Sequence, residues 1–213
     1  MKSIVGRLFK FDSNEAMKTP GLIAGVDEAG RGPLAGPVVA AAVILPRRYN
    51  FRFLNDSKQV TPARREVLFR QIAGSGLVGI GIVDEKVIDK INIYQATRLA
   101  MRQAVLALTR TPDMLLVDGN MTLDLPLLQK SVIKGDEKSA AIAAASIIAK
   151  VCRDAWMTHL ETIYPSYRFS AHKGYGTREH IETIRRIGPT PVHRFSFGPV
   201  QNPNLVVETG EIE

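Results

Sequence analysis

The stretch that most constrains this chain is an apolar run that ends in two adjacent acids and then breaks into glycines. Its residues are Ile23-Ala24-Gly25-Val26-Asp27-Glu28-Ala29-Gly30-Arg31-Gly32. A carboxylate at the end of a buried strand is costly unless it is paired or binds a metal ion. Glycines directly after it let main-chain N–H groups come close to a ligand. The stretch therefore predicts a buried strand that brings acids to the rim of a site, with an ordinary polar turn as the alternative.

Composition favours a globular protein with an anionic partner. The chain has 213 residues, of which 45% are hydrophobic and 23% charged, which fits a single α/β domain spanning residues 1–213. Lys and Arg number 28 against 21 Asp and Glu, for a net charge of +7. This excess favours nucleic acid over a membrane as the partner. Nothing in the sequence requires more than a monomer.

Cysteine usage and hydropathy predict the compartment. A single cysteine, Cys152, excludes an internal disulfide and suits a reducing cytoplasm. The N-terminus has no apolar run typical of a signal peptide. The longest apolar stretch, residues 37–46, is far shorter than the roughly 20 residues of a membrane span. We therefore expect a soluble cytoplasmic protein without membrane contact.

Hydrophobic periodicity and turn residues predict an alternation of strands and helices. The first two strands are separated only by a Gly/Pro loop and are expected to pair as antiparallel neighbours. Residues 1–20 are expected to form a short flap, residues 166–176 a loop, and about 200–213 a loosely held acidic tail. Strands are predicted over residues 22–27, 37–45, 76–83, 114–118 and 131–134, and helices over 61–73, 84–89, 93–108, 137–163 and 177–187.

Acids stand just beyond an apolar strand at three places: Asp27-Glu28, Asp118 and Asp136. Strands of one α/β sheet can bring such ends together. Oxygen donors without clustered histidines suit Mg²⁺ or Mn²⁺ over zinc. Two such ions, roughly 4 Å apart, can activate water and stabilise the leaving oxygen in phosphodiester hydrolysis. The basic residues would then hold the flanking phosphates.

Each acid also has an ordinary structural interpretation. Asp136 could cap the long helix, and Asp118 with the following glycine could form a turn. Asp27 and Glu28 are consecutive, so a regular strand would send them to opposite faces. Both serve one site only if Glu28 lies in the turn or reaches the site from a neighbouring direction. Asp154, if on the same helix as Asp136, would lie roughly 27 Å away and is expected at the surface.

Taken together, the chain resembles ribonuclease HII, the bacterial type 2 ribonuclease H. The resemblance covers about residues 22–200 in the right order. Residues before 22 are too few for the N-terminal extension of the related type 3 enzymes, which also lack the Gly-Arg-Gly form of the motif. The matching runs are residues 25–38, 54–58, 117–119, 134–136, 144–151 with 153–154, 172–177 and 193–197.

The resemblance implies a ribonuclease-H-like α/β fold, with a mixed five-stranded central sheet flanked by helices and a C-terminal helical portion. It also implies endonucleolytic cleavage of RNA paired with DNA, and incision 5′ to single ribonucleotides in duplex DNA, leaving 5′-phosphate and 3′-hydroxyl ends. The metal-binding carboxylates that it implies are Asp27, Glu28, Asp118 and Asp136, which would hold two Mg²⁺ or Mn²⁺ ions, with Asp27 bridging them.

The resemblance further implies substrate contacts. Gly30-Arg31-Gly32 would grip the ribonucleotide 2′-hydroxyl, the group that distinguishes RNA from DNA locally. Tyr175 would stack on the sugar of the next nucleotide. Candidate phosphate contacts are Lys58, Lys150, Lys173 and Arg194. Two alternatives stay open: a related nuclease that cuts DNA alone, such as a resolvase or exonuclease, and a hybrid-binding module without activity.

Overall fold

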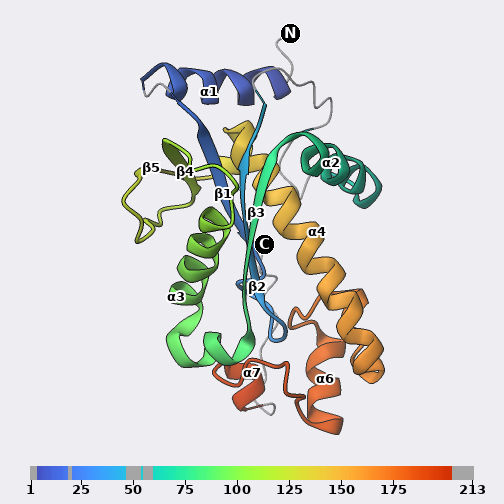
Figure 1. The fold of residues 1–213 in the computed structure, drawn as a ribbon. Coiled ribbons are helices and arrows are strands. Elements are labelled where there is room, and N and C mark those ends of the chain that lie inside the picture. Colours follow the sequence, from blue (N-terminus) through green and yellow to red (C-terminus); the bar gives the residue numbers. More distant parts are fainter. Residues whose placement is uncertain (1–3, 19–20, 47–53, 55–59, 203–213) are drawn as a thin grey trace.

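The computed structural model describes residues 4–18, 21–46, 54 and 60–202. The predictions at Lys58 and for residues 203–213 lie outside this part of the chain. Figure 1 shows a central sheet with helix α3 on one face and helices α2 and α4 on the other, while α1 crosses one end. The predicted α/β architecture with a C-terminal helical portion is confirmed.

The sheet is mixed, with strand order β3-β2-β1-β4-β5. The predicted antiparallel pairing of the first two strands is confirmed. Strands β1 and β4 pair in parallel at the centre, and β5 extends the parallel side. The last strand begins and ends earlier than predicted. The strands are β1 (Ile23–Ala29), β2 (Val38–Ile44), β3 (Leu77–Val83), β4 (Met114–Asp118) and β5 (Leu128–Val132).

Two predicted helices, over residues 84–89 and 93–108, form one element, α3, which is interrupted at Asn92. Asn92 has φ of 66°, and its side chain accepts a hydrogen bond from the N–H of Gln95, so it caps the second stretch. No helix among the described residues is long and apolar enough to cross a membrane. The helices are α1 (Ile4–Lys18), α2 (Pro62–Ser75), α3 (Glu85–Leu106), α4 (Ala140–Ile163), α5 (Phe169–His172), α6 (Arg178–Ile187) and α7 (Gly198–Gln201), with short 3₁₀ turns η1 (Gly135–Glu137) and η2 (Pro165–Tyr167).

Helix α4 lies unusually close to the sheet. Its N-terminal half is rich in buried alanines, and a Cβ atom added to Gly25 of β1 would lie 2.1 Å from the backbone of Ala141. Ser139 caps this helix by accepting a hydrogen bond from the N–H of Ile142, so Asp136 is not its cap. The small residues thus bring α4 close to β1, and Ser146, two turns into the helix, reaches Asp27.

The expectation of a flap over residues 1–20 is wrong for α1, which packs on the core. Leu8 is buried at 1% exposure, and Glu15 forms an ion pair with Lys130 of β5 at 2.9 Å. Asp12 accepts a hydrogen bond of 2.9 Å from the N–H of Ala141 in the first turn of α4. A carboxylate there satisfies a free N–H at the positive end of the helix dipole. This long-range contact holds α1 across the end of the sheet.

The anchoring of α1 makes stability depend on pH. Burial, the largest cause, raises the pKa of Asp12 to about 6, so the folded protein binds this proton more tightly than the unfolded chain does. Stability from Asp12 is therefore full below pH 4 and is lost as the pH rises through about 6. We expect Asp12→Asn to gain up to about 3 kcal/mol relative to wild type between pH 4 and pH 7.5, measured by urea unfolding. A pH-independent difference would contradict this interpretation.

Candidate active site

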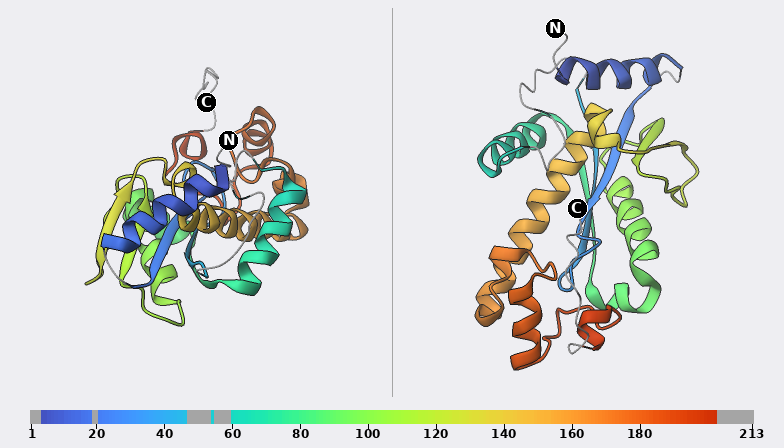
Figure 2. Two further views of the ribbon diagram at one scale, coloured as in Figure 1. Left: turned by 90° about the horizontal axis from the view of Figure 1, so that it is seen from above. Right: turned by 180° about the vertical axis from the view of Figure 1, so that it is seen from behind.

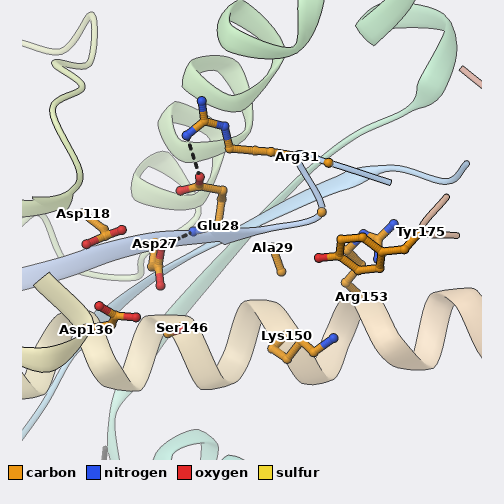
Figure 3. A pocket seen from close by; sticks show the side chains of 12 residues that line it. Asp27, Glu28, Ala29, Arg31, Asp118, Asp136, Ser146, Lys150, Arg153 and Tyr175 are labelled. Carbon is orange, nitrogen blue, oxygen red and sulfur yellow. Dashed lines mark hydrogen bonds and ion pairs between the residues drawn. The ribbon is translucent and has the colours of Figure 1, made fainter. Parts of the chain in front are cut away.

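The parallel pairing of β1 and β4 places acids from distant parts of the sequence side by side. Val26 pairs with Val117, so Asp27 and Asp118, the next residue in each strand, lie level. Asp118 pairs with Val132 of β5, from which the chain continues into η1 and Asp136. All four predicted carboxylates line one cavity of about 300 Å³, shown in Figure 3. The sequence prediction that these acids share a site agrees with this arrangement.

Asp27 and Glu28 reach the cavity from two directions. Glu28 lies within β1 and not in the turn, so the two consecutive side chains leave opposite faces of the strand. In Figure 3, Asp27 points toward Ser146 of α4 and Asp136, whereas Glu28 points toward Arg31. The Glu28 carboxylate accepts a hydrogen bond of 3.4 Å from the Arg31 guanidinium. The sequence required that Glu28 either lie in the turn or reach the site from a neighbouring direction. The structure shows the second arrangement.

Main-chain N–H groups hold one oxygen of three of the acids. Asp27 Oδ1 accepts from the N–H of Glu28 at 2.7 Å, and Asp136 Oδ1 from that of Glu137 at 3.1 Å. Asp118 Oδ1 accepts a 2.6 Å bond from the N–H of Gly135, which ties the end of β4 to η1. These bonds restrict the side-chain rotamers and orient the carboxylates.

Burial and neighbouring negative charges oppose ionisation of two of the acids, Asp27 and Glu28. Burial, then the charges of Glu28 and Asp118, raise the pKa of Asp27 well above its usual range. Burial also raises the pKa of Glu28, although the Arg31 guanidinium beside it acts in the opposite direction. Like charges held together in a buried site are a destabilising arrangement unless a cation joins them.

The donor set fits a hard divalent cation by residue type. All four side chains offer carboxylate oxygens, the donors that Mg²⁺ and Mn²⁺ prefer. As they are placed, no three acidic, histidine or cysteine side chains of the described residues surround one common point. The four side chains therefore fit a divalent cation by the type of their donor atoms and by their shared cavity. They would have to rotate to coordinate one ion together.

Several predicted substrate contacts line the same cavity as the acids. Gly30, Arg31, Gly32, Tyr175 and Lys150 all line it. Tyr175 is 45% exposed. Figure 3 shows the Tyr175 ring next to the Arg153 side chain and beyond Ala29 from the acids. The catalytic and recognition groups predicted from the sequence thus share one groove.

The side chains predicted to contact phosphates differ in their surroundings. Lys150 forms an ion pair of 2.8 Å with Asp154, and Lys173 Nζ donates to the hydroxyl of Thr158 at 3.1 Å, so both ammonium groups lie near α4. Asp154 lies outside the acidic cavity, as expected. The prediction for Arg194 is wrong, because its side chain is fully buried and its guanidinium donates to main-chain carbonyls.

Two polar residues of the cavity were missed from the sequence as site residues. Ser146 hydrogen-bonds to Asp27 and lowers the pKa of that acid, against the larger effect of burial. Arg153 lies below the glycine loop and lines the cavity although only 1% of it is exposed. A polar residue on the sheet-facing side of an alanine-rich helix was the available signal for Ser146.

Three histidines gather although their spacing suggested no cluster. His180 Nε2 lies 3.0 Å from His193 Nε2, and His180 Nδ1 lies 2.8 Å from the carbonyl oxygen of Tyr175. His172 stacks on His180 with ring centroids 4.3 Å apart. Burial lowers the pKa of His180 to about 3, so the ring is neutral at physiological pH. These rings support the segment that carries Tyr175.

The sheet order and the acidic cavity define a protein of the ribonuclease-H-like fold. A solved structure of ribonuclease H2 from Pyrococcus horikoshii has the same fold, with a TM-score of 0.71 and 27% identity over 85% of this chain and 96% of that one. The family model for ribonuclease HII matches residues 24–200. The chain belongs to the ribonuclease HII family.

Curated relatives agree closely with this assignment. Ribonuclease HII of Geobacter sulfurreducens is 53% identical over 91% of this chain and 90% of its own length. The Geobacillus kaustophilus enzyme is 59% identical over 84% of this chain and 69% of its own. Membership supports degradation of the RNA of RNA–DNA hybrids and a general dependence on divalent metal ions.

Removing one charge from the acidic cavity should stabilise the metal-free protein. We expect Asp27→Asn to raise the free energy of unfolding in EDTA at pH 8 by about 1–3 kcal/mol, because burial and the charges of Glu28 and Asp118 make an ionised carboxylate at this position unfavourable. Added Mn²⁺ should stabilise the wild type more than the variant. The exposed Asp124→Asn is the matched control and should change neither value. Destabilisation of Asp27→Asn in EDTA would contradict the proposed arrangement of charges.

Proposed function

We propose that this chain is an endonuclease that hydrolyses the RNA strand of RNA–DNA hybrids and incises 5′ to single ribonucleotides in duplex DNA, leaving 5′-phosphate and 3′-hydroxyl ends. The observation that carries the proposal is one cavity lined both by the four carboxylates and by the Gly30–Gly32 segment with Tyr175. Groups able to bind metal ions therefore adjoin groups able to contact a ribose. We further infer that the chain acts as one domain and as a monomer.

The carboxylates Asp27, Glu28, Asp118 and Asp136 would hold two Mg²⁺ or Mn²⁺ ions. When bound, such ions activate the attacking water and stabilise the leaving oxygen of a phosphodiester. The protein restricts the direction of two of these carboxylates. Asp27 is oriented by Ser146 and by the N–H of Glu28, and Asp118 by the N–H of Gly135. These hydrogen bonds limit the side-chain rotation that binding of the ions requires.

Recognition would use the groove beside the acids. A protein that distinguishes RNA from DNA must contact the 2′-hydroxyl, which both donates and accepts hydrogen bonds. The main chain of Gly30 and Gly32 has no side chain to block that approach, and Tyr175 offers a half-exposed ring for stacking. Lys150, which lines the cavity, and Lys173, two residues before Tyr175, would hold flanking phosphates. The net charge of +7 supports attraction of the duplex.

The direct test uses duplex DNA that contains one ribonucleotide, with an all-DNA duplex of the same sequence as control. We expect a single cut 5′ to the ribonucleotide in Mg²⁺ or Mn²⁺, and none in EDTA or in the control duplex. Cleavage of both duplexes would indicate a general nuclease. Salt-dependent binding of hybrid without any product would indicate a silent binding module.

Tyr175 should matter most where a single ribonucleotide is followed by DNA. We expect Tyr175→Ala to lower kcat/KM for the singly substituted duplex by about 10- to 100-fold, since base or sugar stacking contributes roughly 1–3 kcal/mol. Tyr175→Phe keeps the ring and should retain most of the activity. Tyr94→Ala, an equally exposed tyrosine outside the cavity, is the control. Equal loss in the Phe and Ala variants would rule out stacking as the role.

A further inference from the structure

Two buried arginines lie beneath the glycine loop. Arg153 of α4 is 1% exposed and Arg194 is fully buried. Among the described residues, neither guanidinium forms an ion pair with a carboxylate. Burying an unpaired charge is costly unless hydrogen bonds replace its hydration. The partners of these two side chains therefore decide what they do.

The partners are almost all carbonyl oxygens of residues 30–37, which we call the recognition loop. Arg194 donates to Gly36, Arg31, Pro33 and Gly30 at 3.0, 2.9, 2.7 and 2.6 Å. Arg153 donates to Pro37 at 3.0 Å and to Ala35 at 3.2 Å. A guanidinium presents five N–H donors in a rigid planar fork, and here the two forks fix the path of one loop.

The other side of the recognition loop faces the cavity. The carbonyls of Gly30 and Arg31 are turned inward by Arg194. Within the described part of the chain, no group accepts a hydrogen bond from the N–H of Gly30, Arg31 or Gly32. These donors belong to residues that line the cavity, where a ligand oxygen would be their partner.

The glycine at position 30 follows from the same packing. Gly30 has φ of 99°, and a Cβ atom on it would lie 2.0 Å from Nε of Arg153. The left-handed conformation and the close approach of the guanidinium both exclude a side chain there. In the sequence, Gly30-Arg31-Gly32 is typical of a flexible glycine loop. In the structure this loop packs on the side chain of Arg153.

Arg153 also joins the recognition loop to the segment that carries Tyr175. Its Nη1 donates to the carbonyl of Lys173 at 2.9 Å, and its guanidinium lies 6.0 Å from the Tyr175 ring centroid. The N–H of Leu34 donates to the carbonyl of Gly174 at 2.8 Å. Both proposed ribose contacts are therefore held on one support.

The two groups keep their charge at physiological pH. Burial, the largest cause, lowers the pKa of Arg194 to about 9 and that of Arg153 to about 10, both above neutrality. Two positive charges thus lie under the loop, and charge alone would also attract a phosphate. The arginines could therefore affect ligand binding either by the geometry of their hydrogen bonds to the loop or by their charge, and these two effects can be separated by experiment.

We propose that Arg153 and Arg194 are positioning residues whose guanidinium forks preform the recognition loop, so that discrimination of a ribonucleotide from a deoxynucleotide depends on the fork and not on the charge. This inference rests on the proposed function, because it assumes that the loop contacts the 2′-hydroxyl. Arg194 acts on the loop alone, and Arg153 acts on both the loop and the segment of Tyr175.

The test is Arg194→Lys, which keeps the charge and removes the fork. Fluorescence anisotropy in EDTA, where nothing is cut, gives the Kd of a duplex with one ribonucleotide and of the all-DNA duplex. The measure of discrimination is the Kd of the all-DNA duplex divided by the Kd of the duplex with one ribonucleotide. We expect this ratio to fall by about tenfold or more toward unity in the variant, because small misplacements of positioning groups carry penalties of this size. Affinity for the all-DNA duplex should stay within about twofold, since the charge remains.

Controls separate positioning from general damage. Ile72→Ala removes buried volume from α2, whose core cluster contains no residue of the loop, and it should lower the melting temperature while keeping the Kd ratio of the wild type. If Arg194→Lys does not fold, the same measurements on Arg153→Lys decide. A folded lysine variant with the wild-type ratio overturns the inference. A wild-type protein that does not discriminate overturns the proposed function itself, and the inference with it.

Discussion

The structure depends on the parallel pairing of β1 with β4 at the centre of the sheet. This register sets Asp27 level with Asp118, and the continuation through β5 adds Asp136. Burial, then the charges of Glu28 and Asp118, raise the pKa of Asp27, so the site is unfavourable for stability by itself. A bound divalent cation would offset that repulsion. The fold thus keeps several carboxylates together at a cost in stability, at the place where a divalent cation would need negative charge.

Close packing of α4 on β1 connects this centre to recognition. Because Gly25 and the alanines of α4 are small, the helix backbone approaches the sheet, and its later turns pass under the cavity. Ser146 then reaches Asp27, and further along the helix Arg153 reaches the loop that follows β1. A single helix, which runs along the sheet in Figure 2, therefore contacts both Asp27 and the loop of the proposed ribose contacts.

Local sequence patterns predicted what depends on local physics. Apolar runs indicated the five strands, the short Gly/Pro loop indicated the antiparallel pair, and acids at strand ends indicated the cavity. Features set by long-range contacts were missed. Helix α1 is held by Leu8 in the core and by Asp12 at the start of α4, and no periodicity in residues 1–20 indicates those partners. Arg194 suggested a surface phosphate contact because nothing local shows that main-chain carbonyls surround it.

Anomalous scattering from crystals grown with Mn²⁺ tests most directly whether the four carboxylates form a divalent-cation site. We expect anomalous peaks inside the cavity, with carboxylate oxygens of Asp27 and Asp118 at about 2 Å, the distance typical of small hard cations. We also expect these peaks to be lost in Asp27→Asn. Mn²⁺ peaks only elsewhere on the molecule at saturating metal, with none between β1 and β4, would contradict this expectation.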